Sequence, residues 1–126
     1  MKHLRSIVVL VLTAPVGAAT ASNHIVDIQW SNEGRFQHQS QVAAGKFVEV
    51  CGKLASGSAI RWSFDASAAV DFNVHYHVGK DVVFPFKLTA VASAKDTLDA
   101  KIEQDYCWTW RNKSAETATV TVRLQR

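Results

Sequence analysis

The chain has 126 residues, of which 48% are hydrophobic, with 14 basic residues, 11 acidic residues and two cysteines. That length and apolar content suit one domain with a single core. The charges are interspersed without basic runs, which argues against a nucleic acid partner, because such affinity depends on clustered Lys and Arg that neutralise phosphates.

The N-terminus has the build of a secretory signal peptide. A short basic head, Met1–Arg5, precedes an apolar run that Pro15 and Gly17 interrupt and that closes in small residues. The alternative is a membrane anchor, but a bilayer span needs roughly 20 apolar residues and this run is shorter. The pattern therefore predicts export from the cytoplasm.

The cleavage rule for signal peptides, A-x-A, is best matched by Ala19-Thr20-Ala21. We expect residues 1–21 to be removed and residues 22–126 to form one periplasmic or extracellular domain without a membrane span. Loss of Lys2 and Arg5 leaves twelve of the 14 basic residues against 11 acidic ones, so the mature chain is nearly neutral.

The remaining chain reads as a series of short strands separated by turn signals. Period-two alternation and β-branched or aromatic residues mark the strands. In chain order the expected strands are His24–Trp30, Gly45–Cys51, Ile60–Asp65, Val70–His77, Val82–Phe84, Thr97–Ile102, Tyr106–Trp110 and Ala118–Leu124, with Arg35–Gln41 a loop or a weak edge strand.

Several connections can be predicted as well. A short polar turn should join the strands on either side of Ala66–Ala69, and Val78–Asp81 should form a tight turn. Pro85 cannot donate to a ladder, so it belongs at an edge or a bulge. The stretch Lys87–Asp96 is rich in Ala and Ser and could be a helical turn, although it lacks a sustained helical period.

Seven or eight strands with hardly any helix predict an all-β, antiparallel β-sandwich. We expect its core to contain Trp62, Phe64, Phe72, Val74, Tyr106, Trp108, Trp110, Val120 and Val122.

The two cysteines, Cys51 and Cys107, have two interpretations. An even number of cysteines in an exported domain favours one disulfide, which would tie the two layers together. The competing interpretation is a pair of metal-binding thiolates, but neither cysteine has the CxxC context typical of such sites.

The order of several short motifs resembles the GOLD domain, the lumenal β-sandwich module of the Golgi-dynamics family of cargo receptors. The motifs are VEVCGKL, IRWSF, VDFNVHY, YCWTWRNKS and ATVTVRL, and together they cover roughly residues 47–124. The resemblance concerns the module alone, without the coiled coil and membrane span of the cargo receptors. It implies a jelly-roll-like sandwich, a Cys51–Cys107 disulfide and a non-catalytic role in protein or lipid recognition.

One row of polar residues is the main candidate site. Asp71, Asn73, His75 and His77 alternate with apolar residues and should share one outer face of a strand. We expect this row to be a binding surface for a protein or a small ligand. Two imidazoles on one face could also hold copper, nickel or zinc, but the simpler explanation is that they are ordinary polar residues on a solvated face, because an HxH pattern often arises by chance.

A second candidate metal ligand is His24. Cleavage after Ala21 would expose Ser22-Asn23-His24, whose amine, amides and imidazole suit square-planar Cu(II) or Ni(II). No motif for a catalytic nucleophile is present, so we do not expect an enzyme. Asn112-Lys113-Ser114 matches the N-glycosylation pattern and is also a turn signal. The sequence thus favours a binding module without a required cofactor, with a copper- or nickel-binding protein as the alternative.

Overall fold

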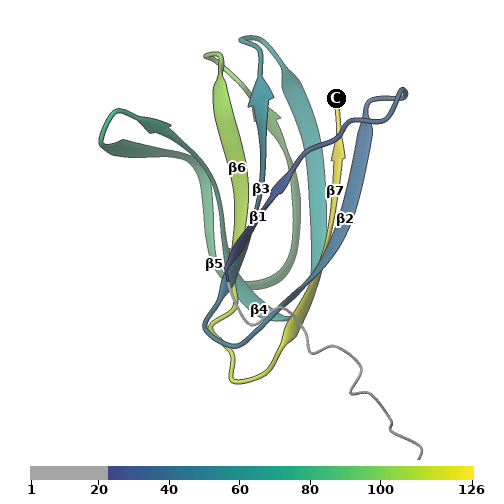
Figure 1. Ribbon diagram of the computed structural model, residues 1–126, viewed down its shortest axis with the longest axis vertical. Coiled ribbons are helices and arrows are strands. Elements are labelled where there is room, and N and C mark those ends of the chain that lie inside the picture. Colours follow the sequence, from purple (N-terminus) through teal and green to yellow (C-terminus); the bar gives the residue numbers. More distant parts are fainter. Residues whose placement is uncertain (1–22) are drawn as a thin grey trace, which may run out of the picture.

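The computed structural model describes residues 23–126, so the expected signal peptide and its cleavage site lie outside the described residues. Seven strands make up one sheet (Figure 1). They are β1 (His24–Asp27), β2 (Arg35–Val42), β3 (Phe47–Leu54), β4 (Ala59–Val78), β5 (Asp81–Asp99), β6 (Gln104–Arg111) and β7 (Ala118–Gln125). Among residues 23–126 there is no helix with the length and apolarity that a membrane span requires.

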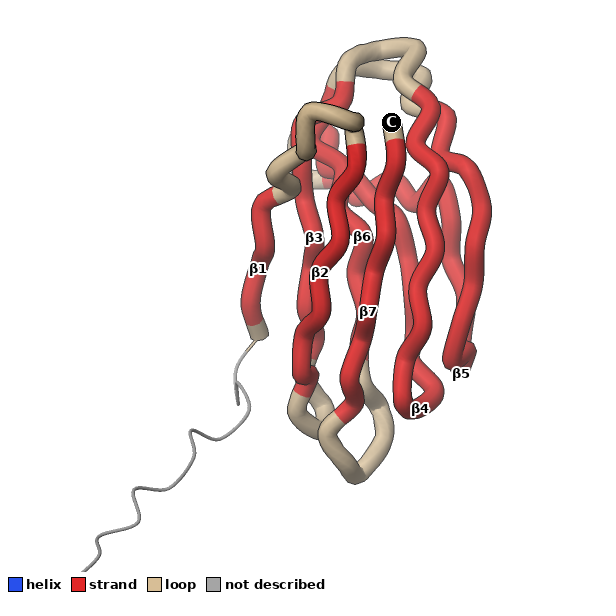
Figure 2. The backbone as a smooth tube through the Cα atoms, turned by 90° about the vertical axis from the view of Figure 1, so that its right-hand side faces the viewer, coloured by secondary structure: helices blue, strands red, loops and turns tan. Residues whose placement is uncertain are grey.

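The single sheet folds over on itself and so produces the two layers of a sandwich. The strand order is β1-β3-β6-β4-β7-β2, with β5 paired to β4. The first part of β4, Arg61–Ala66, pairs with β7, and the later part, Asp71–His75, pairs with β6. Strand β4 therefore belongs to both layers, and Figure 2 shows β2 and β7 in front of β3 and β6.

The expected polar turn inside this region is wrong, because β4 runs unbroken for 20 residues. The small side chains of Ala66–Ala69 instead lie where the pairing with β5 shifts register, between Asp65 and Val70. Such an irregularity bends a strand without ending it. The tight turn at Val78–Asp81 is confirmed, with Gly79 at a positive φ of 59°.

The core lies between the two layers, and the prediction for it is confirmed. All nine expected side chains are at most 4% exposed. Phe72 joins the two halves of β4, because its ring centroid lies 4.9 Å from that of Trp62 and 4.7 Å from that of Phe64. Aromatic pairs at these separations stabilise a fold by roughly 0.5–1.5 kcal/mol each beyond the burial of their area.

The sheet is mixed rather than purely antiparallel. Strand β1 runs parallel to β3, whereas the remaining pairs are antiparallel. Arg35–Gln41 lies in an edge strand, which is one of the two predictions made for it, because among the described strands β2 pairs only with β7. Lys87–Asp96 belongs to β5 and is not helical, since its pairing with β4 overrides the weak local pattern.

Candidate functional site

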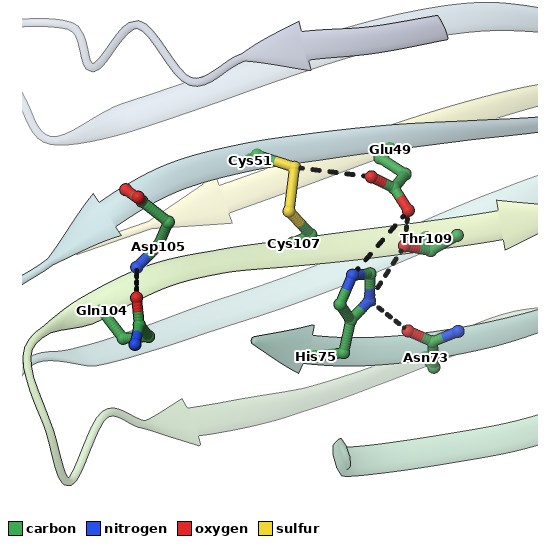
Figure 3. The surroundings of a disulfide bond; sticks show 8 residues. All are labelled: Glu49, Cys51, Asn73, His75, Gln104, Asp105, Cys107 and Thr109. Atoms are coloured by element: carbon green, nitrogen blue, oxygen red, sulfur yellow. Dashed lines mark hydrogen bonds and ion pairs between the residues drawn. A yellow bond between two sulfur atoms is a disulfide. The ribbon is translucent and has the colours of Figure 1, made fainter. Parts of the chain in front are cut away.

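The disulfide lies on the outer face of the layer that contains β3 and β6 (Figure 3). Cys51 and Cys107 are directly opposite each other, with their Cα atoms 4.1 Å apart. The predicted bond is therefore present. It joins two neighbouring strands of one layer. The expectation that it would tie the two layers together is therefore wrong.

The pairing of the strands places further residues in one row with the two cysteines. His75 of β4 is opposite Cys107, and Asp27 of β1 is opposite Cys51. The next row along the strands contains Asn73, Thr109 and Glu49. Side chains opposite each other on one face lie within contact distance, so the two rows form one cluster.

The polar groups of this cluster contact one another. Thr109 Oγ1 donates to Glu49 Oε1 at 3.3 Å, and Glu49 Oε1 lies 3.8 Å from His75 Nε2. His75 Nδ1 lies 2.8 Å from Asn73 Oδ1. An amide oxygen only accepts hydrogen bonds, so Nδ1 carries the proton, and in the neutral ring Nε2 is the unprotonated nitrogen.

His75 is 6% exposed. The expectation that it lies on a solvated surface is therefore wrong. The ring of Phe84 on β5 lies beside it, with a centroid separation of 5.9 Å. Burial lowers the pKa of His75 below its usual 6.5, while Glu49 raises it and His77 lowers it. The imidazole is therefore neutral at physiological pH.

The predicted polar row does share the outer face of β4, but its members mostly satisfy one another. Asp71 accepts a hydrogen bond from the Ala90 backbone and pairs with Lys113. The hydrogen bond from Lys113 is the main reason that the pKa of Asp71 is lowered. Asn73 bonds His75, and only His77 is exposed, with its ring centroid 5.2 Å from that of His75.

The structure does not bring His24 to the histidine pair. His24 is opposite Val48, which faces the core, whereas His75 is on the outer face. The neighbour of His24 is instead His38 on β2, whose pKa is lowered first by burial and then by His24. The proposed terminus at Ser22 lies outside the described residues.

A second site, which we call the cationic hollow, lies on the outer face of the other layer. It has a volume of about 810 Å³ and is lined from β2, β4, β5 and β7. Its four basic side chains, all exposed, are Arg35, Arg61, Lys95 and Arg123.

Register explains why these four bases gather. Arg35 and Arg61 are in one row, each opposite Gln125. Arg123 and Lys95 are in the next row, each opposite Ser63. Strands lie about 4.8 Å apart and a two-residue step is about 6.7 Å, so the four bases zigzag across the sheet.

Two carboxylates moderate the charge of the cationic hollow. Asp65 Oδ2 lies 3.3 Å from Arg123 Nη1, and Asp96 is part of the lining. The hollow stays cationic because four bases outnumber these two acids. The sequence did not predict this cluster, because the bases come from four separate strands. Three of the bases directly precede Phe36, Trp62 and Leu124, and this alternation was the one sign in the sequence that they point outward.

No protein-family model matches the chain, and no curated protein matches it significantly. Solved structures are similar to it in fold. PliG of Aeromonas hydrophila, a periplasmic inhibitor of g-type lysozyme, superposes with a TM-score of 0.59 at 10% identity, covering 84% of this chain and 98% of PliG.

Two other solved structures are similar. The pre-peptidase C-terminal domain of a Bacillus anthracis collagenase has a TM-score of 0.58 at 9% identity, covering 86% of this chain and 100% of that domain. The Yersinia pseudotuberculosis-derived mitogen has a TM-score of 0.57 at 12% identity, with coverages of 72% and 84%. None of the three is a GOLD domain, so that resemblance stays a prediction. At these identities the comparisons establish the fold: an all-β sandwich.

Proposed function

We propose that the protein is an extracytoplasmic binding module without catalytic activity, and that it docks the acidic surface of a partner protein in the cationic hollow. The gathering of Arg35, Arg61, Lys95 and Arg123 around one hollow carries this proposal. Guanidinium groups bind carboxylates through paired hydrogen bonds, and a field of one sign steers an oppositely charged partner.

An extracytoplasmic location is supported by the disulfide, which persists in oxidising compartments. The expected signal peptide agrees with it. A. hydrophila PliG, which shares the fold, is described as a periplasmic protein that inhibits an enzyme. We infer that this chain likewise acts by contact with a partner.

The absence of catalysis is supported by the geometry around His75. Thr109 is the hydroxyl closest to this imidazole, 3.3 Å from Nδ1, and it is only 8% exposed. Nδ1 carries the proton that Asn73 accepts, so it cannot take a proton from Thr109. Thr109 and His75 are thus placed like a nucleophile and its general base. The ring nitrogen that faces Thr109 is the protonated Nδ1, however, so His75 cannot act as that base.

A protein partner is favoured over an acidic glycan by the aromatic lining of the hollow. Trp62 is the largest aromatic residue there, and it is 4% exposed because its ring packs in the core. A buried ring does not offer the face that a sugar would stack on. Contacts with carboxylates through the four bases remain as the main source of affinity.

Binding of poly-L-glutamate tests the proposal. We expect Arg35→Ala/Arg61→Ala/Arg123→Ala to weaken binding at least tenfold at low salt, because three charge-assisted contacts are lost. Added salt should weaken binding of the unaltered protein. Affinity can be measured by fluorescence anisotropy of the labelled polymer.

The matched control removes three exposed lysines outside the hollow: Lys53→Ala/Lys80→Ala/Lys113→Ala has the same net charge. Equal losses in both triple variants would show that net charge alone drives binding and would refute the site. Tighter binding of polygalacturonate through the same arginines would replace the protein partner with an acidic glycan.

The alternative function, copper or nickel binding by His75, His77 and His24, stays a prediction. One observation favours His75 as a ligand, namely that its Nε2 lies 3.8 Å from Glu49 Oε1, which is a second group that binds metals. Metal analysis of untagged protein against His75→Ala/His77→Ala separates the two functions, because a binding module should contain no metal in either form.

A further inference from the structure

Groups of the kinds that bind metals gather at the disulfide, on the layer opposite the cationic hollow. Within residues 23–126, the one group of three metal-ligating side chains whose ligand atoms all lie within 4.8 Å of one another is Glu49, Cys51 and Cys107. His75 adds a fourth group, because its Nε2 lies 3.8 Å from Glu49 Oε1 and it is opposite Cys107.

We propose that reduction of the Cys51–Cys107 bond converts this cluster into a zinc site. Its ligands are the two thiolates, Nε2 of His75 and the carboxylate of Glu49. This ligand set differs from the three histidines considered above, and the proposal does not depend on the cationic hollow.

The chemistry balances with a dithiol as reductant. The dithiol supplies two electrons and two protons to the S–S bond and becomes a disulfide itself, leaving Cys51 and Cys107 as thiols. Zn²⁺ then displaces the two thiol protons, because the thiolate is the form that coordinates metal. The oxidised protein has no thiolate, so the disulfide prevents Cys51 and Cys107 from binding zinc.

The present geometry already holds three of the four ligands together, and the His75 ring must move closer to the two sulfurs to complete the site. Cys51 and Cys107 are directly opposite on paired strands, so their thiolates stay side by side on one face after the bond breaks. Zinc bonds of 2.0–2.3 Å in a tetrahedron place neighbouring ligand atoms roughly 3.5 Å apart. Glu49 is already near this spacing, 3.9 Å from Cys51 Sγ and 3.8 Å from His75 Nε2.

The groups behind the ligands are also those that a metal site requires. A histidine that binds metal through one nitrogen donates its other N–H to a fixed acceptor. Asn73 Oδ1 is that acceptor, and Figure 3 shows it on the side of the ring away from Glu49. Thr109 donates to the Glu49 carboxylate and so orients it.

The ligand set suits zinc better than Cu(II) or Ni(II). Thiolates together with imidazole and carboxylate in a tetrahedral arrangement suit Zn²⁺, whereas Cu(II) and Ni(II) favour square-planar nitrogen and oxygen sets. Both cysteines and Glu49 are partly exposed, so the ion has access from the outer face.

Calorimetric titration of Zn²⁺ into the mature chain tests the proposal, before and after reduction by a phosphine, which adds no thiol. We expect one zinc per reduced chain and binding to the oxidised chain about 100-fold weaker or absent, because the thiolates are lost. His75→Ala and Glu49→Gln should each weaken binding by about tenfold or more, and Asn73→Ala by about 10–100-fold. Co²⁺ in place of Zn²⁺ should show the absorption bands of a tetrahedral thiolate site.

His77→Ala is the matched control, since this histidine is exposed beside His75 and should leave the affinity unchanged. Cys51→Ser/Cys107→Ser should bind no zinc, and its circular dichroism shows whether the fold survives without the bond. Unaltered affinity in His75→Ala, equal binding to oxidised and reduced chains, or a reduced chain that stays unfolded with zinc present would each overturn the proposal.

Discussion

Asn112 shows how much one buried amide can organise. It is 0% exposed, and its Nδ2 donates to the carbonyls of Val42 and Glu116. Its Oδ1 accepts from both the backbone N–H and the hydroxyl of Ser114. The glycosylation pattern at this position is therefore used as a turn, because the amide nitrogen is fully engaged inside the folded chain.

We expect Asn112→Ala to lower the free energy of unfolding by about 3 kcal/mol, because several hydrogen bonds are lost and buried groups are left unpaired. Urea unfolding measures this change. Ser114→Ala, which keeps both bonds from Nδ2, should cost about 1 kcal/mol. Equal effects of the two substitutions would contradict the central role of Asn112.

His75 predicts a loss of stability in mild acid. Burial holds its folded pKa below 6.5, so the unfolded chain binds a proton more readily than the folded one. The stability that the neutral ring contributes is complete above pH 6.5 and is lost as the pH falls towards the folded pKa. The charged or titratable groups that face it are Glu49, which opposes this effect, and His77, which adds to it.

Thermal unfolding at neutral pH and at about pH 5 checks this prediction. His75→Gln should reduce the pH dependence without abolishing it, because His38 is shifted in the same direction. His77→Gln should retain most of the dependence. If His75→Gln had the same pH profile as the unaltered protein, the assigned cause would be wrong.

At the scale of elements, the disulfide reinforces one strand pair. It closes a loop of 56 residues in sequence separation between β3 and β6. We expect Cys51→Ala/Cys107→Ala to lower the free energy of unfolding by roughly 2–4 kcal/mol, mainly because the unfolded chain gains freedom. Urea unfolding of both forms measures the change, and an unchanged midpoint would contradict this account.

Strand β4 is the element that the rest of the sheet depends on. It pairs with β5 along its length and with β7 and β6 in turn. The four bases of the cationic hollow surround its first part, and His75 lies in its second part. The bend near Ala66–Ala69 therefore places the two candidate sites on opposite layers.

Considered as a whole, the molecule could be predicted from its sequence to the level of strands and core. Alternation is a local property, so it correctly placed the nine core side chains and put Asp71 and His77 on the outer face of β4. Pairing between distant strands is not local. For that reason the parallel β1, the continuous β4, the cationic hollow and the contacts of His75 with Glu49 and Thr109 were not predicted.

The contacts of the disulfide cluster show this limit. Asn73 and His75 are two residues apart and could be seen together in the sequence. Glu49 and Thr109 join them only because β3, β6 and β4 are neighbours in the sheet. The four bases of the cationic hollow are likewise isolated in the sequence and adjacent in the fold.

The free edge of β5 affects how readily the protein aggregates at high concentration. Next to the tight turn, Val82, Val83 and Phe84 are 38–45% exposed on a strand that, within residues 23–126, pairs only with β4. An exposed apolar edge of this kind can pair with a strand of another molecule, which is the first step of fibril formation and aggregation. Pro85 follows directly and offers no N–H to an added strand, so the predicted edge position of this proline is confirmed, and the proline protects this edge against self-association.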